Sequence, residues 1–359
     1  MSDTPAPLVR ARDLARHYPV GGGIFRKASR VIRAVDGVSL DIARGETLAL
    51  VGESGSGKTT TGRMLLHLEL PTAGTVSFEG VDLASLDAKS MRALRRRMQL
   101  VFQDPFGSLN PRMTIGDTVK EGLLIHRLAE GAEADRRTRA LLDEVGLRPE
   151  WADRYPHEFS GGQRQRVGIA RALSVGPDFI VLDEPVSALD VSVQAQVINL
   201  LTDLQKQRGL TYLCIAHDLS VVEHVADRVA VMYLGRIVEL ATRDAIFAEP
   251  LHPYTQALRS AVPVADPNVR ARRIVLAGEP PSPADPPTGC TFHPRCHHPA
   301  KDVACARLVP PLEEKAPGRF AACFKQPPTT VTWEAQQAAG GTRPPSRYLP
   351  VLALDARSA

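Results

Sequence analysis

The sequence predicts an α/β fold, and two strand–helix units carry this prediction. An apolar run, Thr47-Leu48-Ala49-Leu50-Val51, leads through a glycine-rich stretch into the helical pattern Gly62-Arg63-Met64-Leu65-Leu66. A second apolar run, Phe179-Ile180-Val181-Leu182, ends in two acidic residues. An amphipathic helical pattern then follows from Ser192 to Gln207. Both units place polar residues directly after a buried strand, which is where α/β proteins bind ligands.

Length and composition indicate an ordinary globular protein. The 359 residues allow one large domain with an appendage, or two modest domains. A net charge of +4 permits contact with acidic membranes or nucleic acid but argues for neither. The sequence shows no signal peptide and no apolar stretch long enough to cross a bilayer. We therefore expect a cytoplasmic protein that reaches a membrane only through a partner.

The glycine-rich stretch has the form of a Walker A phosphate loop. It reads Gly52-Glu53-Ser54-Gly55-Ser56-Gly57-Lys58-Thr59-Thr60. Its glycines let several N–H groups point into one concavity, and the positive end of the following helix adds to that field. Lys58 is placed to bind the β- and γ-phosphates of ATP, and the Thr59 hydroxyl to coordinate Mg²⁺. A Gly/Ser turn that matches by chance is the alternative, but the flanking strand and helix favour a P-loop NTPase (RecA-like) core.

The second apolar run, Phe179 to Leu182, is followed by two acidic residues, as a Walker B strand is. Asp183 would hold Mg²⁺ through water, and Glu184 would polarise the water that attacks the γ-phosphate. The alternative is a buried strand with a solvated acidic end, which the phosphate loop makes the weaker interpretation.

Three further side chains are candidates for contact with the nucleotide. Gln103 ends the predicted strand 99–102 and can reach Mg²⁺ or the attacking water, although this signal is weak by itself. His217 ends the predicted strand 211–216 and can contact the γ-phosphate. Tyr18 lies upstream of the phosphate loop, where it either stacks on adenine or only packs, and the sequence leaves both open.

The rest of the first 245 residues divides into two further parts. Residues 31–42 and 74–83 have the strand patterns of an antiparallel β-subdomain. Residues from about 105 to 175 are helix-rich and predict an inserted helical lobe. The lobe closes on Ser160-Gly161-Gly162-Gln163, in which Ser160 is a good N-cap and the glycines leave the helix start uncovered. This is either a second anion site or an ordinary capped helix.

These features follow one another in the order found in ABC-transporter ATPase subunits, which the chain resembles from residue 11 to about 245. Three shorter stretches resemble the dipeptide/oligopeptide importer ATPases in particular. They are Arg16-His17-Tyr18-Pro19-Val20, the run from Asp183 to Ser192, and His252-Pro253-Tyr254.

The resemblance implies a head-to-tail pair of ATPase subunits. Each ATP would lie between the Walker A loop of one subunit and the signature of the other, here Ser160 to Gln163, with Asp190 in the D-loop. It implies a second ATPase subunit in a heterodimer, two membrane permeases and an extracytoplasmic peptide-binding protein. This chain would then lie at the cytoplasmic face of the inner membrane. The segment Asp104 to Pro111 would face the permease. Import of nickel or another small solute is one alternative, and a soluble ABC ATPase acting on nucleic acid or ribosomes is a weaker one.

The cysteines gather near the C-terminus. Four of the five are Cys290, Cys296, Cys305 and Cys323. In a reducing cytoplasm such a group more often holds metal than disulfides. Four thiolates suit either an iron–sulfur cluster or structural Zn²⁺, and His293, His297 and His298 keep a mixed zinc site open.

The segment Gly289-Cys290 to Arg295-Cys296 resembles the C-terminal extension of the importer family, which carries a [4Fe–4S] cluster in some members. This resemblance favours the cluster over zinc. The expected domains are a nucleotide-binding domain at 1–245, the extension with its four-cysteine metal site at 246–325, and a disordered or loosely packed tail at 326–359.

Overall fold

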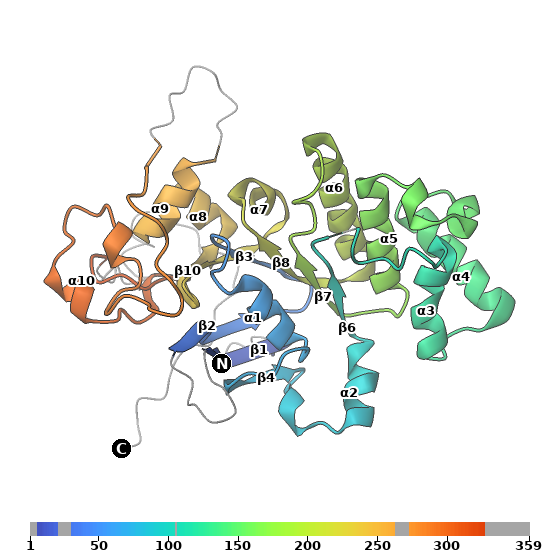
Figure 1. Cartoon of the computed structure of the whole chain (residues 1–359), viewed down its shortest axis with the longest axis horizontal. Coiled ribbons are helices and arrows are strands. Elements are labelled where there is room, and N and C mark those ends of the chain that lie inside the picture. The colour runs from blue at the N-terminus through green and yellow to red at the C-terminus, as the bar shows by residue number, and fades with distance from the viewer. Residues whose placement is uncertain (1–5, 21–29, 105, 263–272, 327–359) are drawn as a thin grey trace, which may run out of the picture.

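The computed structural model describes residues 6–20, 30–104, 106–262 and 273–326, and two β-sheets organise them (Figure 1). The smaller sheet is antiparallel, with the order β2 (Arg30–Ile42), β1 (Val9–Val20), β4 (Ala73–Phe78) and β5 (Val81–Asp82). The larger sheet has eight strands, in the order β11 (Glu313–Ala316), β12 (Arg319–Ala321), β10 (Arg236–Thr242), β9 (Arg228–Tyr233), β3 (Thr47–Val51), β8 (Thr211–Ala216), β7 (Phe179–Asp183) and β6 (Met98–Val101). Almost all of the predicted tail, 327–359, lies outside the described residues.

The centre of the larger sheet is parallel. Strands β6, β7, β8, β3 and β9 pair in parallel, and every residue of β3, β7, β8 and β9 is buried. Buried parallel strands need apolar side chains on both faces, which explains the apolar runs in the sequence. Their carboxyl ends meet at one edge of the sheet, so the polar residues after β3, β7 and β8 are brought together there.

Ten α-helices surround the sheets in the part of the chain that the structure describes (Figure 1). They are α1 (Lys58–Leu65), α2 (Ala88–Arg95), α3 (Ile115–Ile125), α4 (Gly131–Glu144), α5 (Gly161–Leu173), α6 (Val191–Arg208), α7 (Leu219–Val225), α8 (Arg243–Ala248), α9 (Pro253–Ser260) and α10 (Val303–Arg307). Short 3₁₀ helices occur at Leu83–Ser85, Pro149–Asp153, Pro156–Glu158 and His293–Arg295. Figure 1 shows α3, α4 and α5 at one end of the molecule and α8, α9 and α10 at the other. No helix among the described residues is both long and apolar enough to span a membrane.

Separate apolar cores hold these parts together. One core joins the two sheets and α1 through residues such as Leu14, Leu50 and Phe78. A second joins the parallel strands to the helix-rich region through residues such as Ile180 and Leu201. A third lies under the C-terminal segment, the described residues 246–262 and 273–326, and packs against β9 and β10. The C-terminal segment therefore packs directly on the nucleotide-binding core.

The structure confirms the predicted strands at 47–51 and 211–216, the antiparallel pattern of 31–42 and the helix-rich region before Ser160. One feature differs from the sequence-based picture, in which the core sheet ends near residue 245. Strand β12 pairs with β10, with Glu239 opposite Ala321, and β11 pairs with β12. Two short strands from the C-terminal segment thus extend the main sheet and cover the edge that β10 would otherwise expose. The domain boundaries themselves stay a prediction.

Candidate active site

The phosphate loop runs from the end of β3 into α1. Gly55 and Gly57 have φ angles of 77° and 101°, which glycine adopts without steric cost. A Cβ at Gly57 would lie 2.1 Å from the carbonyl oxygen of Ala34, so the backbone packs too closely there for any side chain. The buried Ser56 hydroxyl has no hydrogen-bond partner among the described residues. The loop therefore has the close-packed glycines of a phosphate cradle and a polar atom left for a ligand.

Lys58 provides a buried positive charge at this cradle. Its Nζ donates hydrogen bonds to the carbonyl oxygens of Gly52 at 2.7 Å and Glu53 at 3.0 Å. Burial lowers the pKa of Lys58, whereas the carboxylates of Glu184, Asp183 and Glu53 act to raise it. A cation that is only 5 % exposed attracts an anion strongly, because little water screens it.

Thr59 and Asp183 lie against each other where α1 faces the end of β7. The Thr59 hydroxyl donates to Asp183 Oδ1 at 2.9 Å. Burial raises the pKa of Asp183, and the hydrogen bond from Thr59 opposes that rise. Hydroxyl and carboxylate oxygens are ligands that Mg²⁺ prefers, so the pair fits the predicted magnesium site.

Glu184 lies at the centre of the site. Its Oε2 accepts hydrogen bonds from Gln103 Nε2 at 2.9 Å and from His217 Nδ1 at 3.0 Å. The φ angle of Glu184 is 45°, an uncommon conformation for a non-glycine residue, and its N–H donates to the Ile215 carbonyl at 3.0 Å. Beside it lies a cavity of about 60 Å³, lined also by His217 and Ser187, which is large enough for a water molecule. Gln103 and His217, predicted from two other strands, thus both contact the Glu184 carboxylate.

The start of α5 is built differently. Ser160 Oγ accepts a hydrogen bond from the Gln163 N–H, and Gln163 Oε1 accepts one from the Ser160 N–H at 2.9 Å. This capping box leaves the amides of Gly161 and Gly162 without intrahelical partners. A Cβ at Gly162 would lie 2.2 Å from Val193 Cγ1, so glycine is required for α5 to approach α6. Ser160 is exposed, and exposed Asp190 precedes α6 without capping it through its side chain.

Tyr18 lies on β1 and is partly buried. Its hydroxyl donates to the Glu69 carboxylate, and the Arg16 guanidinium lies 4.7 Å from the centre of its ring. The ring is therefore held in place. These contacts are compatible with both interpretations from the sequence, and adenine stacking stays a prediction.

The structure does not group the cysteines in the arrangement of a metal site. Among the described residues, no three His, Cys, Asp or Glu side chains are grouped so that they could hold a metal ion. Cys290, Cys296, Cys305 and Cys323 nevertheless line one small cavity together. Burial raises the pKa of Cys290 to about 11, and it also raises the pKa values of Cys296 and Cys323. The four are free thiols in partly apolar surroundings, and the [4Fe–4S] cluster stays a prediction.

Sequence analysis missed the contacts that hold Glu53. Arg295 forms a bidentate ion pair with the Glu53 carboxylate, and the Tyr254 hydroxyl accepts a hydrogen bond from the Glu53 N–H. Tyr254 and Arg295 both lie in stretches that resemble the importer family, but nothing in those stretches indicates a contact with Glu53. Their separation from Glu53 by 242 and 201 positions hides the contacts from any local pattern.

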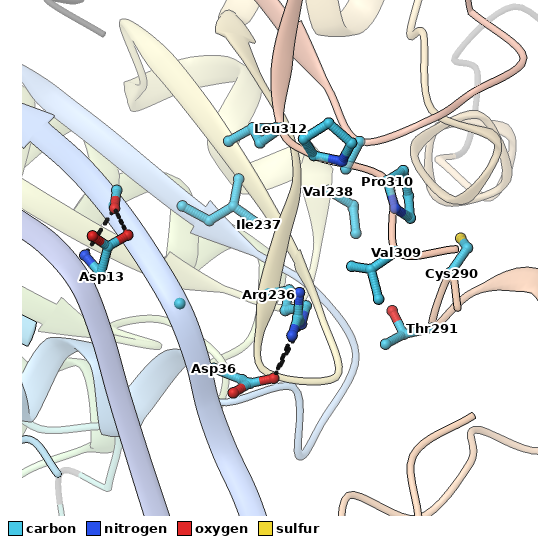
Figure 2. A pocket seen from close by; sticks show the side chains of 14 residues that line it. Asp13, Asp36, Arg236, Ile237, Val238, Cys290, Thr291, Val309, Pro310 and Leu312 are labelled. Atoms are coloured by element: carbon cyan, nitrogen blue, oxygen red, sulfur yellow. Dashed lines mark hydrogen bonds and ion pairs between the residues drawn. The ribbon is translucent and has the colours of Figure 1, made fainter. Parts of the chain in front are cut away.

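A cavity of about 500 Å³ lies elsewhere, between the smaller sheet and the C-terminal segment (Figure 2). Asp36 and Arg236 form a 2.6 Å ion pair in its lining, and Thr291 and Val309 come from the C-terminal segment. No residue of the phosphate loop lines this cavity. It is therefore separate from the nucleotide site.

Two protein families match the chain. The match to the family described as ABC transporter covers residues 35–187, and the match to the oligopeptide/dipeptide transporter C-terminal region covers residues 238–305. Among solved structures, a dimeric post-hydrolysis state of the ATP-binding cassette MJ0796, bound to ADP and Pi, matches with a TM-score of 0.59 and 29 % identity. The match covers 66 % of this chain and 98 % of that one. These results confirm the predicted α/β ABC ATPase fold.

Curated relatives match over nearly the whole chain. A putative peptide import ATP-binding protein of Brucella ovis is 56 % identical, covering 90 % of this chain and 99 % of the relative. The oligopeptide transport ATP-binding protein AppF of Bacillus subtilis is 51 % identical, covering 88 % and 96 %. The dipeptide transport ATP-binding protein DppF of Escherichia coli is also 51 % identical, covering 89 % and 94 %. The chain therefore belongs to the ATP-binding proteins of the oligopeptide/dipeptide ABC transporter family.

Proposed function

We propose that this ABC ATPase hydrolyses ATP to drive the import of dipeptides or oligopeptides, with Glu184 as the general base. One observation carries the catalytic part of the proposal. The Glu184 carboxylate is held by Gln103 and His217 beside a small cavity, at the sheet edge where the phosphate loop begins. A carboxylate fixed next to room for one water can take the proton of that water as it attacks the γ-phosphate.

The neighbouring side chains have matching tasks. Lys58 and the loop amides from Gly52 to Thr60 bind the β- and γ-phosphates, while Thr59, Asp183 and Gln103 provide the oxygens for Mg²⁺. When bound, Mg²⁺ offsets the negative charge that develops on the transferred phosphoryl group. His217 orients Glu184 and lies where it can contact the γ-phosphate.

Adenine would stack on Tyr18. The support for this is that Arg16 and Glu69 hold the ring in one orientation on β1. A rigid aromatic ring binds a base with little loss of conformational entropy.

ATP would be enclosed by two subunits. The uncapped amides at Gly161 and Gly162 lie at an exposed helix start, where they can bind the γ-phosphate of the partner's ATP. Asp190 precedes α6, against which this helix packs, and would act in the D-loop at the same interface. The match to a dimeric cassette bound to ADP and Pi supports this pairing.

We further propose a second, similar ATPase subunit, two permeases and an extracytoplasmic peptide-binding protein as partners. The chain would bind the permeases at the cytoplasmic face of the inner membrane, with the segment from Asp104 to Pro111 facing them. The relatives AppF and DppF are an oligopeptide and a dipeptide transport ATP-binding protein, which supports peptide as the cargo. The test is to purify the chain with its membrane partners and measure ATP hydrolysis with the binding protein loaded with peptide or with nickel. Stimulation by peptide alone is expected, and stimulation by nickel alone would overturn the cargo assignment.

We also propose a metal site at the four C-terminal cysteines. Its support is the shared cavity of Cys290, Cys296, Cys305 and Cys323, and four thiolates would suit a [4Fe–4S] cluster or Zn²⁺. The test is anaerobic purification followed by analysis of iron, acid-labile sulfide and zinc. A brown protein with iron and sulfide would establish the cluster, zinc alone would replace it, and a metal-free protein would leave four structural thiols.

A further inference from the structure

The phosphate loop is held from outside the nucleotide-binding core, at Glu53. Arg295, in the 3₁₀ helix His293–Arg295 of the C-terminal segment, places its two terminal nitrogens 2.8 Å and 3.1 Å from the two carboxylate oxygens. The Arg295 side chain is 8 % exposed and that of Glu53 is 29 % exposed. A bidentate and mostly buried pair of this kind fixes the carboxylate in both position and direction.

Aromatic side chains hold this ion pair in place. The Tyr254 hydroxyl on α9 accepts a hydrogen bond of 2.9 Å from the Glu53 N–H. The Tyr254 ring packs against Tyr233 of β9 and Phe292, with ring centres 4.7 Å and 5.3 Å away, and all three rings are at most 1 % exposed. The Tyr233 hydroxyl lies 3.4 Å from Arg295. The C-terminal segment therefore grips Glu53 through both its side chain and its main chain.

A carboxylate in this loop needs a compensating charge. A phosphate loop attracts a triphosphate through its amides and its lysine, and a free carboxylate among them repels the same ligand. Glu53 is close enough for its charge to act on Lys58, whose Nζ also bonds the Glu53 carbonyl. Arg295 cancels the negative charge of Glu53 and draws the carboxylate to the side of the C-terminal segment.

We propose that Arg295 is a positioning residue that sets the ATP affinity of the phosphate loop by neutralising Glu53. The C-terminal segment is then a working part of the ATP site as well as a structural appendage. This inference rests on ATP binding at the loop.

The experiment compares four forms of the full-length chain: wild type, Arg295→Met, Glu53→Gln and the double variant. The dissociation constants of Mg-ATP and Mg-ADP are measured by calorimetry at two salt concentrations. Met keeps the apolar stem of Arg295 but removes its charge, so Arg295→Met should weaken ATP binding about tenfold. The loss should be smaller for ADP, which carries less charge, and smaller at high salt. The double variant should bind ATP within about twofold of wild type, because it lacks the repelling carboxylate.

Arg319→Met is the matched control. Arg319 also belongs to the C-terminal segment and pairs with a glutamate, Glu249, at 3.2 Å. Its buried Nε has no partner among the described residues, and its recorded contacts do not include the loop. This variant should bind ATP like wild type. Thermal melting of each variant checks that it is folded.

Two results would overturn the proposal. One is unchanged ATP binding in folded Arg295→Met, and the other is a double variant that binds ATP as weakly as Arg295→Met alone. The second result would mean that Arg295 supports the loop by packing and not by charge. Failure of the wild-type chain to bind ATP would instead remove the proposed function, so the two failures are distinguishable.

Discussion

Two regions predicted from the sequence to bind phosphate are built in opposite ways. They are the sheet edge at the phosphate loop and the N-terminus of α5. At the phosphate-loop edge, side chains from different strands bond to one another, as Gln103 and His217 do to Glu184. At the start of α5, the side chains of Ser160 and Gln163 bond to each other's backbone N–H groups. The N–H groups of Gly161 and Gly162 are left without intrahelical partners. The first region is assembled within one chain, whereas the second keeps backbone donors that are free to bind water or an anion. This difference is the one expected if each ATP lies between two subunits, as we propose.

The largest expected effect tests the region that one chain completes. Glu184→Gln should lower the turnover of the assembled complex by about 10³-fold, because the amide cannot accept the proton of the attacking water. ATP binding should persist, since the phosphate loop is intact. Radiolabelled phosphate release and ATP binding are measured together, with Glu144→Gln as the control, because Glu144 pairs with Arg208 away from the site. Normal turnover in Glu184→Gln would remove Glu184 as the base.

The second prediction tests the region that needs a partner. Ser160→Asp keeps a good N-cap but adds a negative charge where the partner's γ-phosphate is proposed to bind. Hydrolysis by the assembled pair should fall about 10²-fold, while the isolated chain binds ATP as before. Thr114→Asp makes the same change at the N-cap of α3 and should leave hydrolysis unchanged. Full activity in Ser160→Asp would contradict the shared site.

A smaller effect is expected when the support of Glu184 is weakened. His217→Ala removes one of its two hydrogen bonds and should lower turnover about tenfold. The KM for ATP should change less than turnover, because the phosphate loop does not depend on His217. His224→Ala is the control, since His224 is exposed on α7 and bonds only the Ser220 carbonyl in the structure. Equal losses in the two variants would show that the effect is not specific to the site.

The smallest effect separates the structural role of Ser160 from its proposed functional role. Ser160→Ala and Thr114→Ala each remove one N-cap, and each should lower the free energy of unfolding by about 1 kcal/mol. Denaturant titration measures this change. Only Ser160→Ala should also reduce hydrolysis by the assembled complex. If both variants lose stability alone, the start of α5 is an ordinary capped helix.

Much of the site was predictable because its pieces are local. The phosphate loop from Gly52 to Thr60, the acidic end of β7 and the capped start of α5 each depend on neighbouring residues. Short-range sterics and hydrogen bonding determine such turns and caps, and these can be read from a few consecutive letters. The parallel direction of the core strands then follows, because buried apolar runs alternate with helices along the chain.

The structure adds contacts that the sequence does not predict, because the residues involved are far apart along the chain. The pairing of β12 with β10 could not be inferred, because β11 and β12 have only 4 and 3 residues and no clear alternation. The four cysteines suggest a metal centre by their number. The structure brings them to one cavity, although no three potential metal ligands among the described residues are grouped to hold an ion. The sequence shows which cysteines are present, but the positions of their sulfur atoms depend on how the backbone folds.

By itself, the sequence determined which residues are candidates for the chemistry: a phosphate loop, Thr59 and Asp183 for Mg²⁺, Glu184 as a base, and a glycine-rich helix start for an anion. The tertiary structure alone decided which of these meet. In the folded chain, Gln103 and His217 form hydrogen bonds with Glu184. Arg295 pairs with Glu53, which lies 242 positions earlier in the sequence. The physical reason is that local motifs are fixed by short-range backbone preferences, whereas contacts across the chain depend on how whole sheets and cores pack.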